Sequence, residues 1–404
     1  MKKGLSLLLG IFLLSSASIA LGDDDNRRGP KGLNHQAESE LIAAGVNKYL
    51  GDFQPAVSEP LGYDDWIKHT FDPDGGDGPI CVAGTPYTIY TKLRNPKKLL
   101  IFMQGGGACW QDFYFCNVLA EAQEPPPAFF LTGVFDESMP ENPLGDYSIA
   151  YLPYCDGSVF SGDNDVVDAN FPFGPVRFHR GLRNASAGID AANGVFPKAK
   201  RIVLAGSSAG GVGVSGFAPF LVRMVFGNRK QLSVFNDAGP VALNPLDIGG
   251  IVARAADWMF GQFYPASCTD CSDMGQGTEI IKWRLDNDRS IRETFYSTDG
   301  DSTNRFFLQV PTQALYRALI VSEHGQINAR HPDRYKRFIR SGDDEHTVLG
   351  RPTFYDYEIN GVPLDQWTAD FLKPGTCSDR GNDDYGKRKK CLWVDVVEDF
   401  IPLP

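Results

Sequence analysis

Short apolar runs alternate along the chain with segments of helical periodicity, and glycine- and proline-rich turns separate them. The apolar runs are rich in β-branched and aromatic residues, which is typical of buried strands. We expect strands at 87–90, 98–103, 148–154, 202–205, 233–236 and 294–298. Helices are predicted early in 38–61, in an alanine-rich segment ending at 193, from 209 to about 225, at 302–322 and at 364–372. This order predicts an α/β fold whose mostly parallel central sheet is flanked by helices.

The strand at 202–205 ends in Gly206-Ser-Ser-Ala-Gly210, which matches the pattern G-x-S-x-G. Small residues continue to Gly216 and lead into the predicted helix. A strand, a tight turn and a helix in this order form the nucleophile elbow of α/β-hydrolases, where the central serine projects above the sheet at a helix N-terminus. The motif predicts Ser208 as a nucleophile. An ordinary tight turn could have the same sequence, so the chain must also supply a base, an acid and an oxyanion hole.

A glycine-rich loop, Gln104-Gly-Gly-Gly-Ala-Cys-Trp110, directly follows the strand at 98–103. Glycines after a buried strand leave backbone N–H groups uncovered and free to point at a ligand. In α/β-hydrolases such a loop supplies one oxyanion donor, and the residue after the nucleophile supplies another. The predicted donors are the N–H groups of Gly106, of Gly105 or Gly107, and of Ala209. The alternatives are a phosphate-binding turn or a bulge, and the order of loop and elbow favours the oxyanion hole.

Three histidines follow the elbow. His324 falls at the end of a predicted helix and His331 lies in a charged run, so we expect both to be solvated. His346 lies in a loop after the last predicted strand and before the closing helix. This is where the fold places its general base. His346 is therefore the predicted base.

The acid is expected between nucleophile and base, at the end of a strand. Asp301 follows the strand at 294–298 and precedes a helix, so it is the preferred acid. Its alternative role is that of a helix N-cap alone. Asp299, two residues earlier, and Asp237, after the preceding strand, remain alternatives, although Asn236-Asp-Ala-Gly239 is more typical of a structural turn.

The chain begins with Met-Lys-Lys-Gly, an apolar run at 5–14 and small residues up to 20, which is the pattern of a secretory signal peptide cleaved after Ala20 or Gly22. Residues 1–22 are therefore expected to be removed. A mobile polar arm at 23–37 and a single catalytic α/β-hydrolase-like domain at 38–404 follow, with a cap or lid insertion at 247–282. We expect a secreted or periplasmic protein without stable membrane association.

Eight cysteines in an exported protein favour disulfides. The local pairs Cys109–Cys116, Cys268–Cys271 and Cys377–Cys391 are preferred, which leaves Cys81 with Cys155, although eight cysteines allow about 105 pairings. The Cys268-Thr-Asp-Cys271 spacing could also indicate zinc, but neither a second such pair nor nearby histidines are present. A disulfide is the better prediction, and no metal or other cofactor is expected.

The net charge of the chain limits which binding partners can be expected. Removal of the first 22 residues takes two lysines from a chain of net charge −11 and leaves 37 basic against 50 acidic residues, a net charge of −13. Such a surface counts against nucleic acid as a partner. An acidic loop at 72–78 could suggest calcium, but no glutamate follows at EF-hand spacing, so a solvated loop is expected.

Together these motifs resemble the pectin acetylesterase/Notum family of exported serine esterases, in its bacterial branch. The resemblance rests on Cys81-Val-Ala-Gly-Thr-Pro-Tyr87, on the glycine loop with Cys116, on Pro153-Tyr-Cys-Asp-Gly157 with Phe160-Ser-Gly-Asp163, and on Gly206-Ser-Ser-Ala-Gly-Gly211. The segments Glu345-His-Thr-Val-Leu349 and Gly361-Val-Pro-Leu-Asp-Gln-Trp367 also fit. It implies Ser208 as nucleophile, His346 as base and Asp301 as acid, with Gly105 to Gly107 and Ala209 at the oxyanion hole.

The resemblance implies a serine esterase that removes O-acetyl or other short acyl groups from a polysaccharide such as pectin. The family also includes deacylases of lipidated protein, so the substrate stays open. Trp110 is the predicted substrate contact, and with the aromatic residues at 113–115 it makes a wider apolar cleft conceivable, as in a lipase or polyester hydrolase. The remaining alternative is a non-catalytic carbohydrate-binding protein on a hydrolase scaffold.

Overall fold

The computed structural model describes residues 32–62, 64–72, 76–120, 131–228, 230–373 and 391–403. The predicted signal peptide, most of the polar arm and Cys377 lie outside these residues. The strands of the central sheet are β1 (Val57–Pro60), β2 (Trp66–Thr70), β3 (Thr88–Lys92), β4 (Lys98–Met103), β7 (Ser148–Leu152), β10 (Arg201–Ser207), β11 (Gln231–Asp237), β12 (Arg292–Thr298), β13 (Tyr335–Arg340) and β16 (Val396–Val397).

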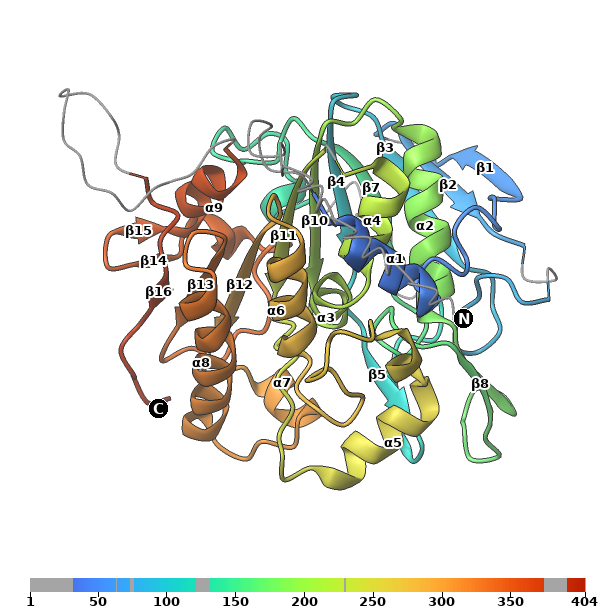
Figure 1. Cartoon of the computed structure of the whole chain (residues 1–404). Helices are drawn as coiled ribbons and strands as arrows, with labels where there is room; N and C mark the ends of the chain where they lie inside the picture. The colour runs from blue at the N-terminus through green and yellow to red at the C-terminus, as the bar shows by residue number, and fades with distance from the viewer. Residues whose placement is uncertain are drawn as a thin grey trace, which may run out of the picture. The chain divides into compact units, whose positions relative to one another are not determined.

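Within the described residues these ten strands form one sheet in the order β1-β2-β3-β7-β4-β10-β11-β12-β13-β16 (Figure 1). Neighbours from β7 to β16 run parallel, and the pairs among β1, β2, β3 and β7 are antiparallel. Three two-stranded sheets consist of β5 (Gly107–Trp110) with β6 (Phe113–Cys116), β8 (Asn164–Val167) with β9 (Val176–His179), and β14 (Glu358–Ile359) with β15 (Val362–Pro363). The predicted α/β class with a mostly parallel central sheet is confirmed.

The described helices are α1 (His35–Ala43), α2 (Gly181–Val195), α3 (Ala209–Ser215), α4 (Ala218–Phe226), α5 (Ile248–Trp258), α6 (Thr278–Asn287), α7 (Ser302–Phe307), α8 (Gln313–Arg330) and α9 (Leu364–Leu372). Short 3-10 helices lie at η2 (Gly133–Phe135), η3 (Phe260–Phe263) and η4 (Pro352–Tyr355). None of the described helices is by itself long and apolar enough to cross a membrane. The bent pair α3 and α4 passes that test only when the two are taken together.

Both faces of the sheet are covered, which explains why strand β4 is apolar at nearly every position. Leu99, Ile101 and Met103 point into one core, which also contains side chains from α2, α4, α6 and α8. Leu100 and Phe102 point into a second core, which includes Trp367 and Phe371 of α9. Figure 1 shows α2, α4, α6 and α8 on the same side of the sheet.

Three predicted disulfides are confirmed: Cys81–Cys155, Cys109–Cys116 and Cys268–Cys271. The second closes the β5–β6 hairpin directly after the glycine loop. Because Cys268 and Cys271 are joined to each other in the third disulfide, they are not available as zinc ligands. Cys391 is also in a disulfide; its predicted partner, Cys377, lies outside the described residues.

Two predicted helices are each divided in two. The helix after the elbow breaks between α3 and α4 with a bend of 57°, because Gly216 ends the first helix and Pro219 lies in the first turn of the second, where its missing N–H costs nothing. The helix predicted at 302–322 is interrupted before α8 by Gln309, at a φ of 53°, and Pro311. Proline cannot continue the helical hydrogen bonding.

The segment described from its sequence as a charged run contains the strand β13. Its apolar residues Tyr335, Phe338 and Ile339 are buried, and its charged residue Arg337 pairs with Asp395 at 2.6 Å. The solvated placement predicted for His324 and His331 is wrong. His324 is fully buried between Tyr335 Oη, at 2.6 Å, and the carbonyl of Pro240, at 2.7 Å, and His331 is 9% exposed.

Candidate active site

Ser208 lies at the sharp turn between β10 and α3. Its φ of 56° and ψ of −119° fall in a region of backbone conformation that residues other than glycine rarely adopt. The turn needs small neighbours, since a Cβ added to Gly210 would lie 1.9 Å from the carbonyl oxygen of Met103. The strand–turn–helix geometry expected of a nucleophile elbow is therefore present, with the Ser208 side chain at the N-terminus of α3.

A continuous hydrogen-bonded relay joins three side chains that are far apart in sequence. His346 Nε2 lies 2.7 Å from Ser208 Oγ, and His346 Nδ1 lies 2.7 Å from Asp301 Oδ2. With Nδ1 protonated, the imidazole donates to the carboxylate and its Nε2 can accept the proton of the serine hydroxyl. The structure thus brings together the three residues that the sequence proposed as nucleophile, base and acid.

Asp301 both caps α7 and faces His346. Its Oδ1 accepts the backbone N–H of Asn304 at 2.8 Å, and its Oδ2 accepts the Asn304 side-chain amide at 2.7 Å as well as His346 Nδ1. Burial raises the pKa of Asp301, and the hydrogen bond from His346 opposes that rise. The N-cap role and the relay role coexist, because they use different carboxylate oxygens.

The two alternative acids are occupied elsewhere. Asp299 accepts hydrogen bonds from Gln313, Arg317 and Ser341 at 2.6–2.8 Å. Asp237 accepts the Ser207 hydroxyl at 2.6 Å. It also accepts the backbone N–H groups of Val348 and Leu349 at 3.0 Å, two and three residues after His346 in the chain. Neither hydrogen-bonds His346, although Asp237 supports the loop that carries it.

The glycine loop lies against the elbow. A Cβ on Gly105 would lie 2.7 Å from Ser208 Cβ, so only glycine allows the loop to come this close. Within the described chain, no hydrogen bond occupies the backbone N–H groups of Gly105, Gly106 or Ala209. Gly107, at a φ of 78°, begins strand β5. The N–H groups near Ser208 are therefore available to an oxyanion.

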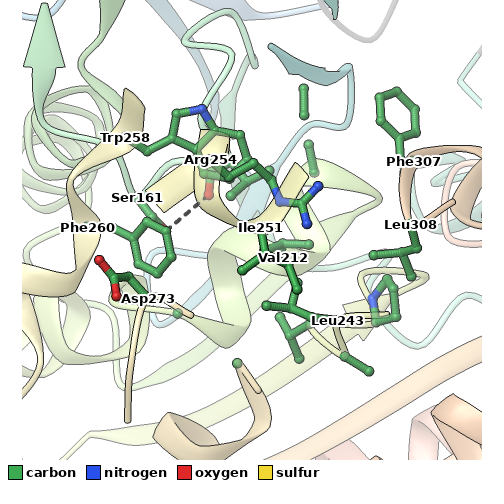
Figure 2. A pocket seen from close by; sticks show the side chains of 18 of the residues that line it. Ser161, Val212, Leu243, Ile251, Arg254, Trp258, Phe260, Asp273, Phe307 and Leu308 are labelled. Atoms are coloured by element: carbon green, nitrogen blue, oxygen red, sulfur yellow. Dashed lines mark hydrogen bonds between the residues drawn. The ribbon is translucent and has the colours of Figure 1, made fainter. Parts of the chain in front are cut away.

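Two cavities meet at Ser208. One, of about 770 Å³, is open and lined by the glycine loop, His346 and polar side chains that include Asn117 and Arg351. The other, of about 170 Å³, has mainly apolar walls (Figure 2). Trp110, the predicted substrate contact, lines this second cavity and stacks on Phe113 with ring centroids 3.9 Å apart.

The segment 247–282 supplies one wall of the apolar cavity. Ile251, Arg254 and Trp258 reach it from α5, and Phe260 reaches it from η3. Among the described residues, no group of three or more His, Cys, Asp or Glu side chains could hold a metal ion. Beside the cavities, the site presents the hydroxyl of Ser208, the imidazole of His346, the carboxylate of Asp301 and the backbone N–H groups.

Part of the chain is similar in sequence to known proteins. The sequence profile of the pectinacetylesterase family matches residues 69–250, which include the glycine loop and the elbow. This part of the chain is similar to the pectinacetylesterase family. The match does not extend to Asp301 and His346. The placement within the bacterial branch stays a prediction.

The chain is also similar to several animal proteins. The chain is 30% identical to the palmitoleoyl-protein carboxylesterase notum1a of Danio rerio over 142 residues, and 28% identical to the human palmitoleoyl-protein carboxylesterase NOTUM over 142 residues. Each match covers 33% of this chain and spans only 28% of the relative. The structure of the Wnt deacylase Notum from Drosophila aligns with a TM-score of 0.55 and 15% identity, over 72% of this chain and 89% of that one. This alignment supports the fold alone.

Sequence reasoning missed two features of the site. Asp237 was considered only as an acid or a turn residue, because its contact with residues 348 and 349 crosses more than 100 positions. Arg254 was not considered at all. The spacing of Ile251, Arg254 and Trp258 puts them on one face of a helix, and this pattern could have identified that face as a cavity wall.

Proposed function

We propose that the chain is a serine carboxylic-ester hydrolase that works through an acyl-enzyme, with Ser208 as nucleophile, His346 as general base and Asp301 as the acid that orients it. The observation that carries the proposal is the relay of two 2.7 Å hydrogen bonds from Ser208 through His346 to Asp301. The family supports the same reaction class.

In the first step, Ser208 Oγ attacks the ester carbonyl and His346 Nε2 takes its proton. The N–H groups of Ala209 and of the glycine loop stabilise the oxyanion, each contributing roughly 3–4 kcal/mol. The C–O bond to the alcohol then breaks, and His346 returns the proton to the departing oxygen. Water then attacks the acyl-enzyme by the same steps, which releases the carboxylic acid product and restores Ser208.

The acyl group occupies the apolar cavity and the alcohol side occupies the larger polar cavity. The mixed polar lining of the larger cavity suits a sugar, which agrees with the removal of O-acetyl or other short acyl groups from a polysaccharide such as pectin. An acetylated polysaccharide is thus the first substrate candidate.

The apolar cavity favours a second candidate, a longer acyl group as in a lipase, a polyester hydrolase or a protein deacylase. An apolar cavity of about 150 Å³ is large enough to bind benzene. The cavity of about 170 Å³ beside Ser208 therefore has room for several carbons beyond an acetyl group. Relatives named as palmitoleoyl-protein carboxylesterases are consistent with this candidate.

The test is hydrolysis of p-nitrophenyl esters from acetate to decanoate by the wild type, Ser208→Ala and His346→Ala. Both variants should lose at least about 10³-fold in kcat. Exposed Ser39→Ala and His35→Ala serve as matched controls and should keep full activity. The chain-length optimum then separates acetylesterase from lipase. A wild type that is inactive on every ester would instead favour a non-catalytic carbohydrate-binding protein, whereas an active Ser208→Ala would refute Ser208 as the nucleophile.

Export belongs to the same proposal. The three described disulfides are consistent with an oxidising, extracellular or periplasmic compartment. The N-terminal residue of protein recovered from the culture medium or periplasm, determined by mass spectrometry, should follow Ala20 or Gly22. A recovered chain that still begins at Met1 would contradict cleavage.

A further inference from the structure

A charged side chain lies within the apolar cavity. Arg254 extends from α5, is only 8% exposed, and lines the same cavity as Ser208. Figure 2 shows its guanidinium among apolar side chains, pointing toward the side of Phe307. A cation is costly to bury unless it gains a partner, so its place in an acyl-binding cavity calls for a functional explanation.

The partners of Arg254 within the chain are weak. Both terminal nitrogens lie 3.4 Å from a single oxygen of Asp247, whereas charge-assisted hydrogen bonds between guanidinium and carboxylate are about 2.7–2.9 Å long. The other oxygen of Asp247 caps α5 through the N–H of Gly250 at 3.1 Å. The positive charge is therefore incompletely matched by Asp247. Burial lowers the pKa of Arg254, but an arginine side chain remains protonated under such conditions, so the cavity wall carries this charge.

The orientation of the guanidinium is nevertheless fixed. It lies over the ring of Trp110 at 4.8 Å from the centroid, and Trp110 stacks in turn on Phe113. This three-layer stack holds the planar group ready for a planar acceptor. The other charged side chain of the cavity wall, Asp273, lies beside Phe260 in Figure 2, away from the guanidinium.

We propose that Arg254 binds a carboxylate at the far end of the acyl group, so that the enzyme accepts hemi-esters of short dicarboxylic acids such as succinic or glutaric acid. This inference rests on the proposed function. By comparison with benzene in a cavity of about 150 Å³, the cavity of about 170 Å³ suits an acyl group of about six to eight heavy atoms, the size of a succinyl or glutaryl group.

The reaction is that of the neutral esters. Ser208 Oγ forms a bond to the ester carbonyl carbon, the bond to the alcohol oxygen breaks, and the serine proton leaves with the alcohol through His346. Water then cleaves the dicarboxylic acyl-enzyme and returns a proton to Ser208. The products are the alcohol and the dicarboxylate, and the remote carboxylate on Arg254 is unchanged throughout.

The experiment compares two esters of matched shape, ethyl hemisuccinate and ethyl 4-methylpentanoate, by the release of ethanol. The measured quantity is the ratio of their kcat/KM values. Arg254→Met should lower this ratio about 10- to 100-fold, the range expected when a charged hydrogen bond is lost. Arg330→Met is the matched control, because Arg330 is another aspartate-paired arginine but is exposed; it should leave the ratio unchanged.

A gain of function is also expected. Asp247→Asn keeps an oxygen for the helix cap but removes the negative charge that competes for Arg254, so the preference for the hemisuccinate should rise several-fold. If Arg254→Met does not fold, calorimetry with Ser208→Ala supplies the answer. That variant should bind ethyl hemisuccinate more tightly than ethyl 4-methylpentanoate.

The outcomes separate the two proposals. A wild type that cleaves neutral esters but not the hemisuccinate, or a ratio unaffected by Arg254→Met, overturns the role of Arg254 alone. Equal binding of the two esters by Ser208→Ala does the same. A wild type that hydrolyses neither of these two esters nor p-nitrophenyl acetate overturns the proposed esterase function itself.

Discussion

Asp301 and Asp299 offer a test in which activity and stability should separate. Asp301→Asn keeps an oxygen that can accept the N–H of Asn304 and so preserves the cap of α7. It replaces the carboxylate that faces His346 Nδ1, however, and an amide there favours the wrong imidazole tautomer. In the serine protease trypsin this change lowers kcat about 10⁴-fold, which corresponds to about 5.5 kcal/mol of transition-state stabilisation.

Stability should change little in this variant. Burial raises the pKa of Asp301 and so disfavours its charge, which means that a neutral amide removes one unfavourable contribution along with the two hydrogen bonds that Oδ2 accepts from His346 and the Asn304 side chain. We expect the free energy of unfolding to change by about 1–2 kcal/mol at most. Asp301→Asn should therefore be folded and almost inactive.

Asp299→Asn should behave in the opposite way. Its carboxylate accepts hydrogen bonds from Gln313, Arg317 and Ser341, and loss of the charge leaves Arg317 without its ion pair. The Arg317 side chain is 18% exposed, so solvent screens part of the loss, and we expect a cost of about 2–3 kcal/mol. In the folded protein kcat should stay within a few-fold of the wild type.

The assay is kcat for the best p-nitrophenyl ester at a temperature where both variants are folded, together with urea denaturation. Each variant serves as the control for the other, since both replace a buried aspartate at the end of the same strand. The reasoning fails if Asp301→Asn keeps more than about a tenth of wild-type kcat, or if Asp299→Asn is the inactive variant.

Three further predictions concern the glycines and Asp237. Gly105→Ala puts a Cβ 2.7 Å from Ser208 Cβ and should lower kcat/KM by about 10²-fold or more; kinetics close to wild type would contradict the close approach. Gly194→Ala in α2 meets nothing within 4 Å and should raise the free energy of unfolding by about 0.5–1 kcal/mol without changing kcat, which thermal denaturation and kinetics will show. Burial raises the pKa of Asp237 to about 6, so its contribution to stability is greatest below its unfolded pKa and is lost as the pH rises through 6. Relative to wild type, Asp237→Asn should gain about 2 kcal/mol between pH 4 and pH 7 in urea denaturation, and a constant difference across this range would refute the assignment.

Elements and site residues that depend on local sequence patterns were predicted well. Strand β4 and helix α9 were predicted with the bounds that the structure has, because an unbroken apolar run and an amphipathic segment between turns are local signals. Ser208 and the glycine loop were proposed for the same reason, since an elbow and a loop after a buried strand each lie within about ten residues.

Features that depend on distant partners were predicted poorly. Strand β13 was missed because its charged positions are balanced by residues such as Asp395, which the local pattern does not reveal. His324 was expected to be solvated, although its two ring nitrogens hydrogen-bond Tyr335 and Pro240 inside the fold. In both cases a polar side chain looks exposed in the sequence until its long-range partner is known.

The separation of Ser208 and His346 shows how such long-range contacts shape the site. Parallel pairing of β10 with β11 places Ser207 opposite Asp237. The carbonyl of Asp237 then accepts the N–H of Ser208 at 2.8 Å, while its carboxylate holds the backbone just after His346. Asp237 therefore ties both the elbow and the loop that carries His346 to the end of β11.

The same strand register also places Asp301, the proposed acid. Strand β12 runs parallel to β11, so the turn that follows it begins α7 at the same edge of the sheet, where Asp301 caps that helix. Adjacent parallel strands thus present the elbow, the tie through Asp237 and the acid at their carboxyl ends, which is where open α/β sheets carry their sites. A shift of one residue between β10 and β11 would move Ser208 away from the carbonyl of Asp237 and from His346, so the register of the sheet is itself a determinant of the relay.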